Sequence, residues 1–220
     1  MKPYKILLVD DHALFRKGIA ALLASRDNFI VVGEAENGRE AIVKTQALQP
    51  DVVLMDVHMP ECDGPTAVHE ILKEQPEIQI IMLTIDETDE TLFEAIKNGA
   101  RGYLMKSMDP EQVFKMIETV AQGGIGFGQA MLSKVLQEFQ NLPAGDASPG
   151  NQLTPRELEI LEQVSIGATN QQIAEALNIT ENTVKKHIKR ILTKLHKQNR
   201  TQAAVYAVRE GLLPNTDPHN

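Results

Sequence analysis

The sequence has few of the features on which disulfide-bonded, membrane or secreted proteins depend. Cys62 is the one cysteine in 220 residues, so no disulfide forms within the chain and no cysteine pair is present for a zinc site. No apolar run approaches the ~20 residues of a membrane-spanning helix. The short apolar N-terminal run leads directly into acidic residues, without the long apolar core and cleavage site of a signal peptide. We therefore expect a cytoplasmic protein that contacts no membrane.

Charge is divided unevenly along a chain of otherwise ordinary composition. Hydrophobic residues make up 42% and charged residues 24%, as in soluble globular proteins, and the length suits one large or two modest domains. Residues 1–150 carry 13 Lys and Arg against 23 Asp and Glu, whereas residues 151–210 carry 9 against 6. An acidic body followed by a basic segment indicates two functions, and the basic segment is the candidate for binding a polyanion.

Residues 1–125 alternate between strand-like and helix-like patterns. Strands rich in Val, Ile and Leu are predicted at Lys5–Val9, Phe29–Gly33, Val52–Met55, Ile78–Leu83 and Gly102–Met105. Five strands alternating with five amphipathic helices, the last over Pro110–Gln122, predict an α/β fold with a doubly wound, five-stranded parallel sheet. In such sheets the functional groups gather at the carboxyl ends of the strands.

The remainder of the chain is predicted to be helical or irregular. Residues 126–152 form a linker with a short helix over Gln129–Gln140, because Asn141–Gln152 is rich in Pro, Gly and polar residues without an apolar period. Residues 153–213 form an all-α domain of four helices. These are predicted near Pro155–Ile166, Asn170–Leu177, Glu181–Leu195 and Thr201–Glu210. Residues 214–220 are expected to be a disordered tail.

Polar side chains end four of the five predicted strands. They are Asp10 and Asp11 after the first strand, Asp56 after the third, Thr84 at the fourth and Lys106 after the fifth. Three clustered carboxylates raise one another's pKa unless a cation lies among them, and oxygen ligands suit Mg²⁺. A carboxylate beside Mg²⁺ can attack phosphorus, while the metal, a lysine and a hydroxyl stabilise the phosphoryl oxygens. The sequence therefore predicts a phosphoacceptor site at this edge of the sheet.

Each of these residues also has an ordinary interpretation. A single strand-end Asp is more often a helix N-cap, Lys106 a solvated side chain and Tyr103 a packing residue. Their coincidence on alternating elements favours a shared site. The imidazoles of His12 and His58 are less favoured as metal ligands, because no pair of histidines at ligand spacing accompanies them.

Residues 4–122 resemble the flavodoxin-like receiver domain of response regulators. The matching motifs are VDDH (Val9–His12), LMDVHMPECDG (Leu54–Gly64), MLT (Met82–Thr84) and GYLMK (Gly102–Lys106). The resemblance implies that Asp56 is the phosphoacceptor. It implies a Mg²⁺ site made by Asp10, Asp11, Asp56 and the backbone carbonyl of His58. It also implies that Thr84 and Lys106 hold the phosphoryl group, and that Tyr103 swings inward as a switch when Thr84 engages it.

Basic side chains line one helix of the second domain. Gln171–Arg190 is predicted to form two helices joined by a turn, with Thr180 as N-cap of the second. The apolar stripe of that helix is Val184, Ile188, Ile191, Leu192 and Leu195. The opposite face carries Lys185, Lys186, Lys189, Arg190, Lys194 and Lys197. A solvated face usually pairs Lys with Glu at four-residue spacing, but no acid lies between Lys185 and Arg200. This pattern favours a helix that enters the major groove of DNA.

Leu153–Leu213 resembles the LuxR-type helix-turn-helix of the NarL/FixJ class of response regulators. The matching motifs are LTPRELEIL from Leu153, GxxNxxIA from Gly167, LxITxxTVK from Leu177 and RxxA from Arg200. By this resemblance, base contacts come from Lys185, Lys186 and Lys189, and phosphate contacts from Asn182, Thr183, His187 and Arg190. The apolar face made by Ala203, Ala204, Val205 and Ala207 is either a dimer face or part of the domain core.

The combined resemblance implies a non-enzymatic transcriptional regulator. A sensor histidine kinase would phosphorylate Asp56, and the protein would dimerise and bind promoter DNA, with RNA polymerase as a further candidate partner. One alternative is a phosphotransferase with an Asp nucleophile, but such enzymes carry a second Asp two residues on, where this chain has His58. Another is a DNA-binding protein with a passive receiver, against which the intact set of site residues argues.

Overall fold

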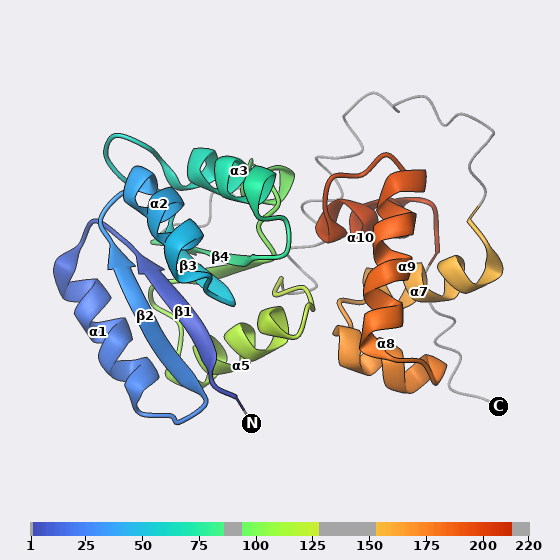
Figure 1. The fold of residues 1–220 in the computed structure, drawn as a ribbon, viewed down its shortest axis with the longest axis horizontal. Helices are drawn as coiled ribbons and strands as arrows, with labels where there is room; N and C mark the ends of the chain where they lie inside the picture. Colours follow the sequence, from blue (N-terminus) through green and yellow to red (C-terminus); the bar gives the residue numbers. More distant parts are fainter. Residues whose placement is uncertain (1, 86–93, 128–152, 213–220) are drawn as a thin grey trace. The chain divides into compact units, whose positions relative to one another are not determined.

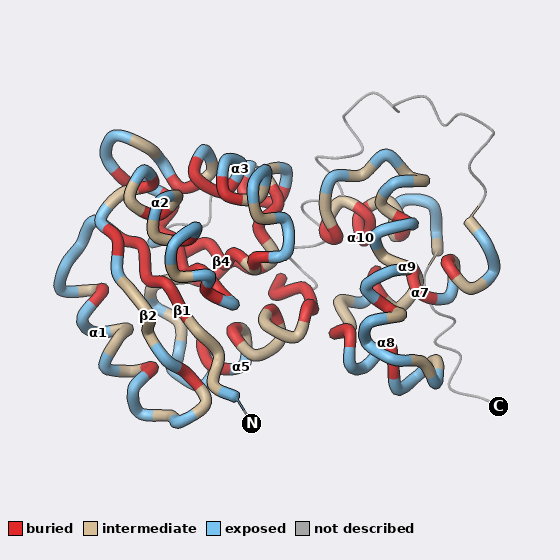
Figure 2. Tube along the Cα trace, in the orientation of Figure 1, coloured by how far each residue is buried: buried red, intermediate tan, exposed pale blue. Residues whose placement is uncertain are grey.

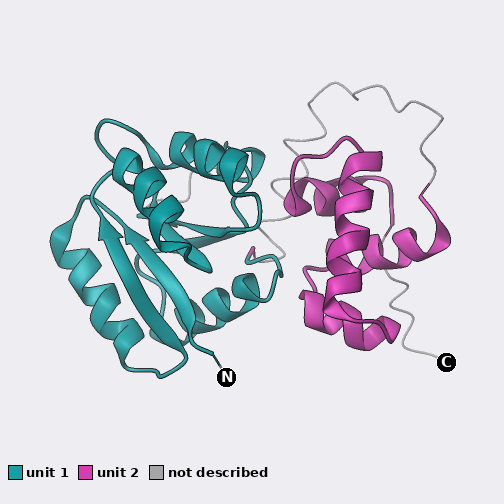
Figure 3. Ribbon diagram, viewed as in Figure 1, with its two compact units in different colours: residues 1–126 teal, residues 127–220 magenta. Residues whose placement is uncertain are grey.

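The computed structural model describes residues 2–85, 94–127 and 153–212. The chain divides into two compact units, residues 1–126 and 127–220 (Figure 3). Among the described residues, no helix combines the length and the apolar character that crossing a bilayer requires. The predicted short helix, the linker beside it and the C-terminal tail lie outside the described residues.

The first unit is a five-stranded parallel sheet between helices (Figure 1). The strands are β1 (Tyr4–Val9), β2 (Phe29–Ala35), β3 (Val52–Asp56), β4 (Gln79–Thr84) and β5 (Gly102–Met105). Their order in the sheet is β2-β1-β3-β4-β5, so the chain winds outward in both directions from β1 and β3. The predicted doubly wound fold is confirmed, with strand ends that differ by no more than two residues from those expected.

Four described helices connect and cover the strands. They are α1 (Ala13–Ala24), α2 (Gly38–Leu48), α3 (Gly64–Glu74) and α5 (Pro110–Ala121). Alternate sheet residues such as Ile6 and Leu54 pack against α1 and α5, and Phe29 stacks on Phe114 at 5.6 Å between ring centroids. A further helix is expected between β4 and β5; in that segment residues 86–93 lie outside the described residues, and residues 94–97 are helical.

The three central strands β1, β3 and β4 are buried along almost their whole length, and because they are parallel their carboxyl ends lie at one rim of the core. Every residue of β3 is buried, as are the last four of β1 and the last five of β4 (Figure 2). A strand with helices on both faces has no polar face, which explains its continuous run of Val, Ile, Leu and Met. Asp56 and Thr84 are therefore the last residues of apolar strands, fixed by the sheet register.

The second unit is helical, and each of its described helices begins at a residue whose side chain caps the helix. The helices are α7 (Pro155–Ser165), α8 (Asn170–Leu177), α9 (Glu181–Lys194) and α10 (Arg200–Arg209). Thr154, Thr169, Thr180 and Asn199 each accept a hydrogen bond from the backbone N–H three residues on. Such caps stabilise a helix by about 1 kcal/mol each, so the sequence defines where these short helices start.

The apolar face of α10 belongs to the core of the second unit. Ala203, Ala204, Val205 and Ala207 are all buried, and α10 packs against α7. Of the two interpretations left open by the sequence, the intramolecular one is therefore correct, and these side chains form no free surface for a second copy of the chain.

The backbone of Gly64 lies too close to the end of β3 to leave room for a side chain. A Cβ at Gly64 would lie 2.3 Å from the Asp56 backbone oxygen and 2.6 Å from Met82 Cε, and the backbone cannot yield as a side-chain end can. Gly64→Ala should therefore lower the free energy of unfolding by about 1–3 kcal/mol. Gly18→Ala is the matched control: a Cβ there meets nothing within 4 Å, and alanine should stabilise α1 by about 0.5–1 kcal/mol. Urea unfolding followed by circular dichroism measures both, and a Gly64→Ala protein as stable as wild type would contradict the prediction.

Candidate functional site

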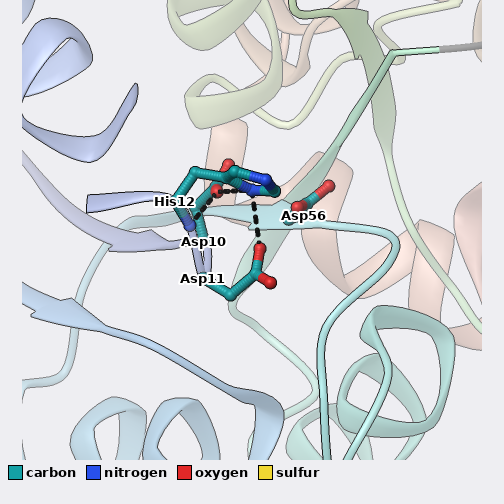
Figure 4. A group of neighbouring side chains, drawn as sticks. All are labelled: Asp10, Asp11, His12 and Asp56. Atoms are coloured by element: carbon teal, nitrogen blue, oxygen red, sulfur yellow. Dashed lines mark hydrogen bonds and ion pairs between the residues drawn. The ribbon is translucent and has the colours of Figure 1, made fainter. Parts of the chain in front are cut away.

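Four side chains that could ligate a metal converge at the carboxyl ends of two adjacent strands. Asp10, Asp11 and His12 follow β1, and Asp56 is the last residue of β3 (Figure 4). One ligand atom from each of the four lies within 4.8 Å of the others. The structure thus brings together the three carboxylates named from the sequence.

Lys106 joins two of these carboxylates. It follows β5, and its Nζ lies 2.7 Å from Asp10 Oδ2 and 2.8 Å from Asp56 Oδ2. The two acids are buried, at 1% and 4% exposure. Burial raises the pKa of Asp56, as do the charges of Asp10 and Asp11, and together they outweigh the opposing effect of Lys106. Burial alone would lower the pKa of Lys106, but hydrogen bonds to the two carboxylates raise it above its usual value, which keeps the ammonium charged.

The charge of this cluster is unbalanced. Three carboxylates face one ammonium, so the group carries an excess of negative charge in a partly dry environment. The side chain of Asp11 is 32% exposed and so leaves the cluster open to solvent on one side. Carboxylate oxygens with room for water are the ligands that Mg²⁺ takes in proteins, and the donor set therefore fits this ion.

The imidazole of His12 lies beside the carboxylates, whereas that of His58 does not. His12 Nδ1 is 2.7 Å from Asp11 Oδ1 and 3.2 Å from Asp10 Oδ1. His58 is exposed on the loop after β3. The sequence did not favour a place for His12 in the cluster, although its position directly after the two aspartates was the available signal.

Thr84 and Tyr103 lie on the strands next to the cluster. Thr84 is the buried last residue of β4, and its backbone oxygen accepts a hydrogen bond of 2.7 Å from the Lys106 N–H. Tyr103 is paired with Met82 in the sheet register and is 3% exposed, so its side chain already lies inside the unit. The Tyr103 N–H donates to the carbonyl of Gly126, 3.3 Å away, where the first unit ends.

A mostly apolar surface pocket of about 570 Å³ adjoins the cluster. It is lined by His12, Leu14, Phe15, Gly18, Ile19, Ile85 and Lys106. Leu14 and Ile85 are 86% and 66% exposed, which is unusual for large aliphatic side chains, and Lys106 Nζ lies 4.8 Å from the Phe15 ring centroid. The carboxylate cluster thus adjoins an apolar surface at His12 and Lys106.

The basic face expected on α9 is present, but its members differ in exposure. Val184 and Ile191 are buried, which turns the opposite face of α9 to solvent. The exposed side chains are Asn182, Lys185, Lys186, Lys189 and Arg190. Thr183 and His187 are half-buried. The Thr183 hydroxyl lies 2.9 Å from that of Thr180 in the helix cap, so it already has a structural partner.

Lys194 does not belong to the free basic face. Its Nζ lies 2.7 Å from Oε2 of Glu157, a carboxylate on α7 that is 3% exposed. Burial favours a raised pKa for Glu157, but hydrogen bonds from Lys194 and Thr154 outweigh it and the pKa lies below its usual value of 4.5. The sequence interpretation, which placed Lys194 on the free basic face, was wrong. It considered only acids four residues away on the same helix, whereas the partner, Glu157, lies on α7.

Two family models match the chain, one over each unit. The response regulator receiver domain model matches residues 6–118, and the model for bacterial regulatory proteins of the luxR family matches residues 151–207. The transcriptional regulatory protein LnrK of Bacillus subtilis is 38% identical over 215 residues, which cover 94% of this chain and 98% of LnrK. The nitrate/nitrite response regulator NarL of Escherichia coli K12 is 35% identical over 212 residues, covering 96% and 98%.

Solved structures of similar proteins share the same organisation. The response regulator ChrA of a heme-sensing two-component system matches with a TM-score of 0.52 and 30% identity, covering 97% of this chain and all of ChrA. The RcsB response regulator of Salmonella typhimurium matches with a TM-score of 0.55 and 25% identity, covering 95% of this chain and all of RcsB.

The buried ion pair on α7 and α9 generates a second prediction. Lys194→Met leaves the Glu157 carboxylate buried without its cation and should lower the free energy of unfolding by about 1–3 kcal/mol, less than a fully buried pair because Lys194 is 31% exposed. Lys185→Met, an exposed position on the same helix, is the control and should change it by under about 0.5 kcal/mol.

The difference between these variants should depend on pH. Since the folded-state pKa of Glu157 is lowered, its stabilising contribution is present above pH 4.5 and is lost as the pH falls through the lowered value. Urea unfolding of both variants at pH 7 and at a pH below the lowered pKa of Glu157 measures this, and a Lys194→Met deficit that is equal at both pH values would exclude the ionised pair as its cause.

Proposed function

This chain belongs to the response regulators that join a receiver domain to a LuxR-type DNA-binding domain. From this membership and the geometry of the acidic cluster, we propose that phosphorylation of Asp56 controls the binding of the chain to DNA. Members of this family are transcriptional regulators rather than enzymes. The observation that carries the proposal is the ammonium of Lys106 between the buried carboxylates of Asp10 and Asp56. A sensor histidine kinase in the cytoplasm is the proposed phosphodonor.

The chemical step is an attack of an Asp56 carboxylate oxygen on the phosphorus of a phosphohistidine. The new O–P bond gives an aspartyl phosphate as the P–N bond breaks, and the imidazole leaves with the electron pair of that bond and takes up a proton. Asp10, Asp11, Asp56 and the His58 backbone carbonyl are the proposed ligands of Mg²⁺, which supplies charge neutralisation at the phosphoryl oxygens. Lys106, already placed against Asp56, would add a second positive charge at the phosphoryl oxygens.

The proposed switch runs through Thr84 and Tyr103. A phosphoryl group on Asp56 offers acceptor oxygens to the Thr84 hydroxyl at the end of the neighbouring strand. Because the Thr84 backbone bonds to Lys106, a shift of Thr84 is transmitted to β5, on which Tyr103 lies. The inward position expected of Tyr103 in the engaged state is the one that it already has in this structure. In this proposal, engagement of Thr84 therefore stabilises Tyr103 in that inward position, and the stabilised surface favours a homodimer.

Helix α9 is the proposed recognition helix. Its exposed cations Lys185, Lys186 and Lys189 are the candidates for base edges in the major groove, and Asn182 and Arg190 for phosphates. The half-buried Thr183 and His187 are candidates for phosphate contacts at the margin of the helix. Two such helices in a dimer would read paired half-sites of promoter DNA.

The phosphoacceptor assignment is tested by labelling. The full chain incubated with Mg²⁺ and acetyl phosphate should give a shifted band on a gel that retains acyl phosphates, and Asp56→Asn should give none, because an amide oxygen is not a competent nucleophile. Asp27→Asn, an exposed acid of the same unit, should label at the wild-type rate. Wild-type labelling of the Asp56→Asn protein would refute the assignment.

The DNA interface is tested with two variants of neighbouring residues. Lys189→Met should weaken binding to a duplex selected from random sequence by about 1–3 kcal/mol and relax specificity at one position. Arg190→Met should weaken binding to all sequences alike and reduce the salt slope by about 1. Lys115→Met, an exposed lysine of the first unit, is the control. Unchanged DNA affinity in both α9 variants would rule out this face of α9.

A further inference from the structure

A buried guanidinium contacts the backbone of Asp10–His12, the segment after β1 that is called the acidic loop below. Arg16, on the first turn of α1, has a side chain that is only 8% exposed. Its Nε lies 3.1 Å from Glu34 Oε2, its Nη2 lies 2.7 Å from Glu36 Oε1, and its Nη1 donates to the backbone oxygen of Asp10 at 2.5 Å. A buried charge that is held by three separate acceptors is a rigid group, and one of its acceptors is part of the proposed metal site.

Every polar group of Asp10 takes part in a hydrogen bond or an ion pair. Its N–H donates to the Ala35 carbonyl at 3.1 Å, and its carbonyl accepts from Arg16. Its Oδ1 accepts from the His12 N–H at 2.8 Å, and its Oδ2 pairs with Lys106 at 2.7 Å. The residue at the end of β1 is therefore fixed at both its backbone and its side chain.

The carbonyl that Arg16 holds belongs to the peptide bond between Asp10 and Asp11. A peptide unit is planar, so fixing the direction of its carbonyl also fixes the position of the next Cα. The carboxylate of Asp11 is the more exposed of the two, at 32% against 2%, and is less constrained by packing. Its placement next to Asp56 therefore depends on the backbone that carries it.

We propose that Arg16 is a positioning residue for the divalent metal, because its hydrogen bond to the Asp10 carbonyl sets the direction in which Asp11 presents its carboxylate to the ion. This inference rests on the proposed Mg²⁺ site. Arg16 itself does not contact the metal. It acts through the peptide plane, as groups behind metal ligands do when they hold those ligands in a productive orientation.

The anchors of Arg16 explain why this position requires a guanidinium. Glu34 and Glu36 flank Ala35, the β2 residue paired with Val9 in the sheet and bonded to the Asp10 N–H. Arg16 therefore ties the end of β1 to the end of β2 through three donors in a fixed planar fork. A lysine keeps the charge but has a single nitrogen on a flexible stem, which cannot reproduce the three directions at once.

The test is a direct Mg²⁺ titration of the full chain, followed by two-dimensional amide NMR. Arg16→Lys should raise the Kd for Mg²⁺ about tenfold, the lower end of the effect of removing a group that orients a metal ligand. The double variant Glu34→Gln/Glu36→Gln keeps Arg16 but weakens the two side-chain acceptors that hold it. This variant should raise the Kd for Mg²⁺ about threefold, because the orientation of the ligand is only partly lost. Lys44→Met is the matched control, because Lys44 also bonds to Glu34 and to Glu40 but not to the acidic loop, and its Kd should stay within about twofold.

The outcomes separate this inference from the function on which it rests. If wild-type protein shows no saturable shifts, or if Asp11→Asn titrates as wild type does, the proposed metal site itself is wrong. If wild type and Asp11→Asn differ as expected but Arg16→Lys binds Mg²⁺ with the wild-type Kd, Arg16 has only a structural role, whatever its effect on thermal stability. Should Arg16→Lys fail to fold, an unchanged Kd in Glu34→Gln/Glu36→Gln overturns the inference instead.

Discussion

The contact between the Lys106 ammonium and two buried carboxylates is the constraint around which the first unit is organised. Asp10, Asp56 and Lys106 follow or end three different strands. The parallel sheet brings those ends to one rim, and the order β2-β1-β3-β4-β5 places β1 and β3 side by side. The apolar strands supply the burial that raises the pKa of Asp56 and strengthens each charge contact. The remaining negative charge favours a cation at this rim of the sheet.

The second unit applies the same physical principle to a different purpose. The ion pair of Glu157 and Lys194 is shielded by helix packing, and it ties the C-terminal end of α9 to α7. That contact orients the helix whose other face carries Lys185, Lys186 and Lys189 to solvent. One lysine of the helix therefore holds it in place, and the others remain available to a polyanion. In both units an ion pair with a buried carboxylate holds neighbouring elements in place. In the first unit the pair lies at the rim of the sheet, and in the second it lies beside the exposed basic face of α9.

The sequence predicted the parts of this structure that depend on local pattern. Strand ends, the helix cap at Thr180 and the meeting of Asp10, Asp11 and Asp56 follow from periodicity, from capping preferences and from the rule that parallel strands end at one edge. The contacts of Arg16 and Lys194 could not be predicted, because each pairs with acids on another element at a distance along the chain that no spacing rule encodes. The burial of Ala203 and Val205 likewise depends on which helix covers α10.

A charge at Asp56 is proposed to change the DNA affinity of a separate unit, and one measurement tests that link most directly. The affinity of the full chain for a selected duplex is determined at fixed salt with Mg²⁺, with and without beryllofluoride as a mimic of the aspartyl phosphate, in wild type and in Asp56→Asn. The mimic should tighten wild-type binding about tenfold, within the usual range of coupling between sites, and should leave the DNA affinity of Asp56→Asn unchanged. Equal affinity, salt dependence and oligomeric state of the wild-type protein in both conditions would contradict the proposed link.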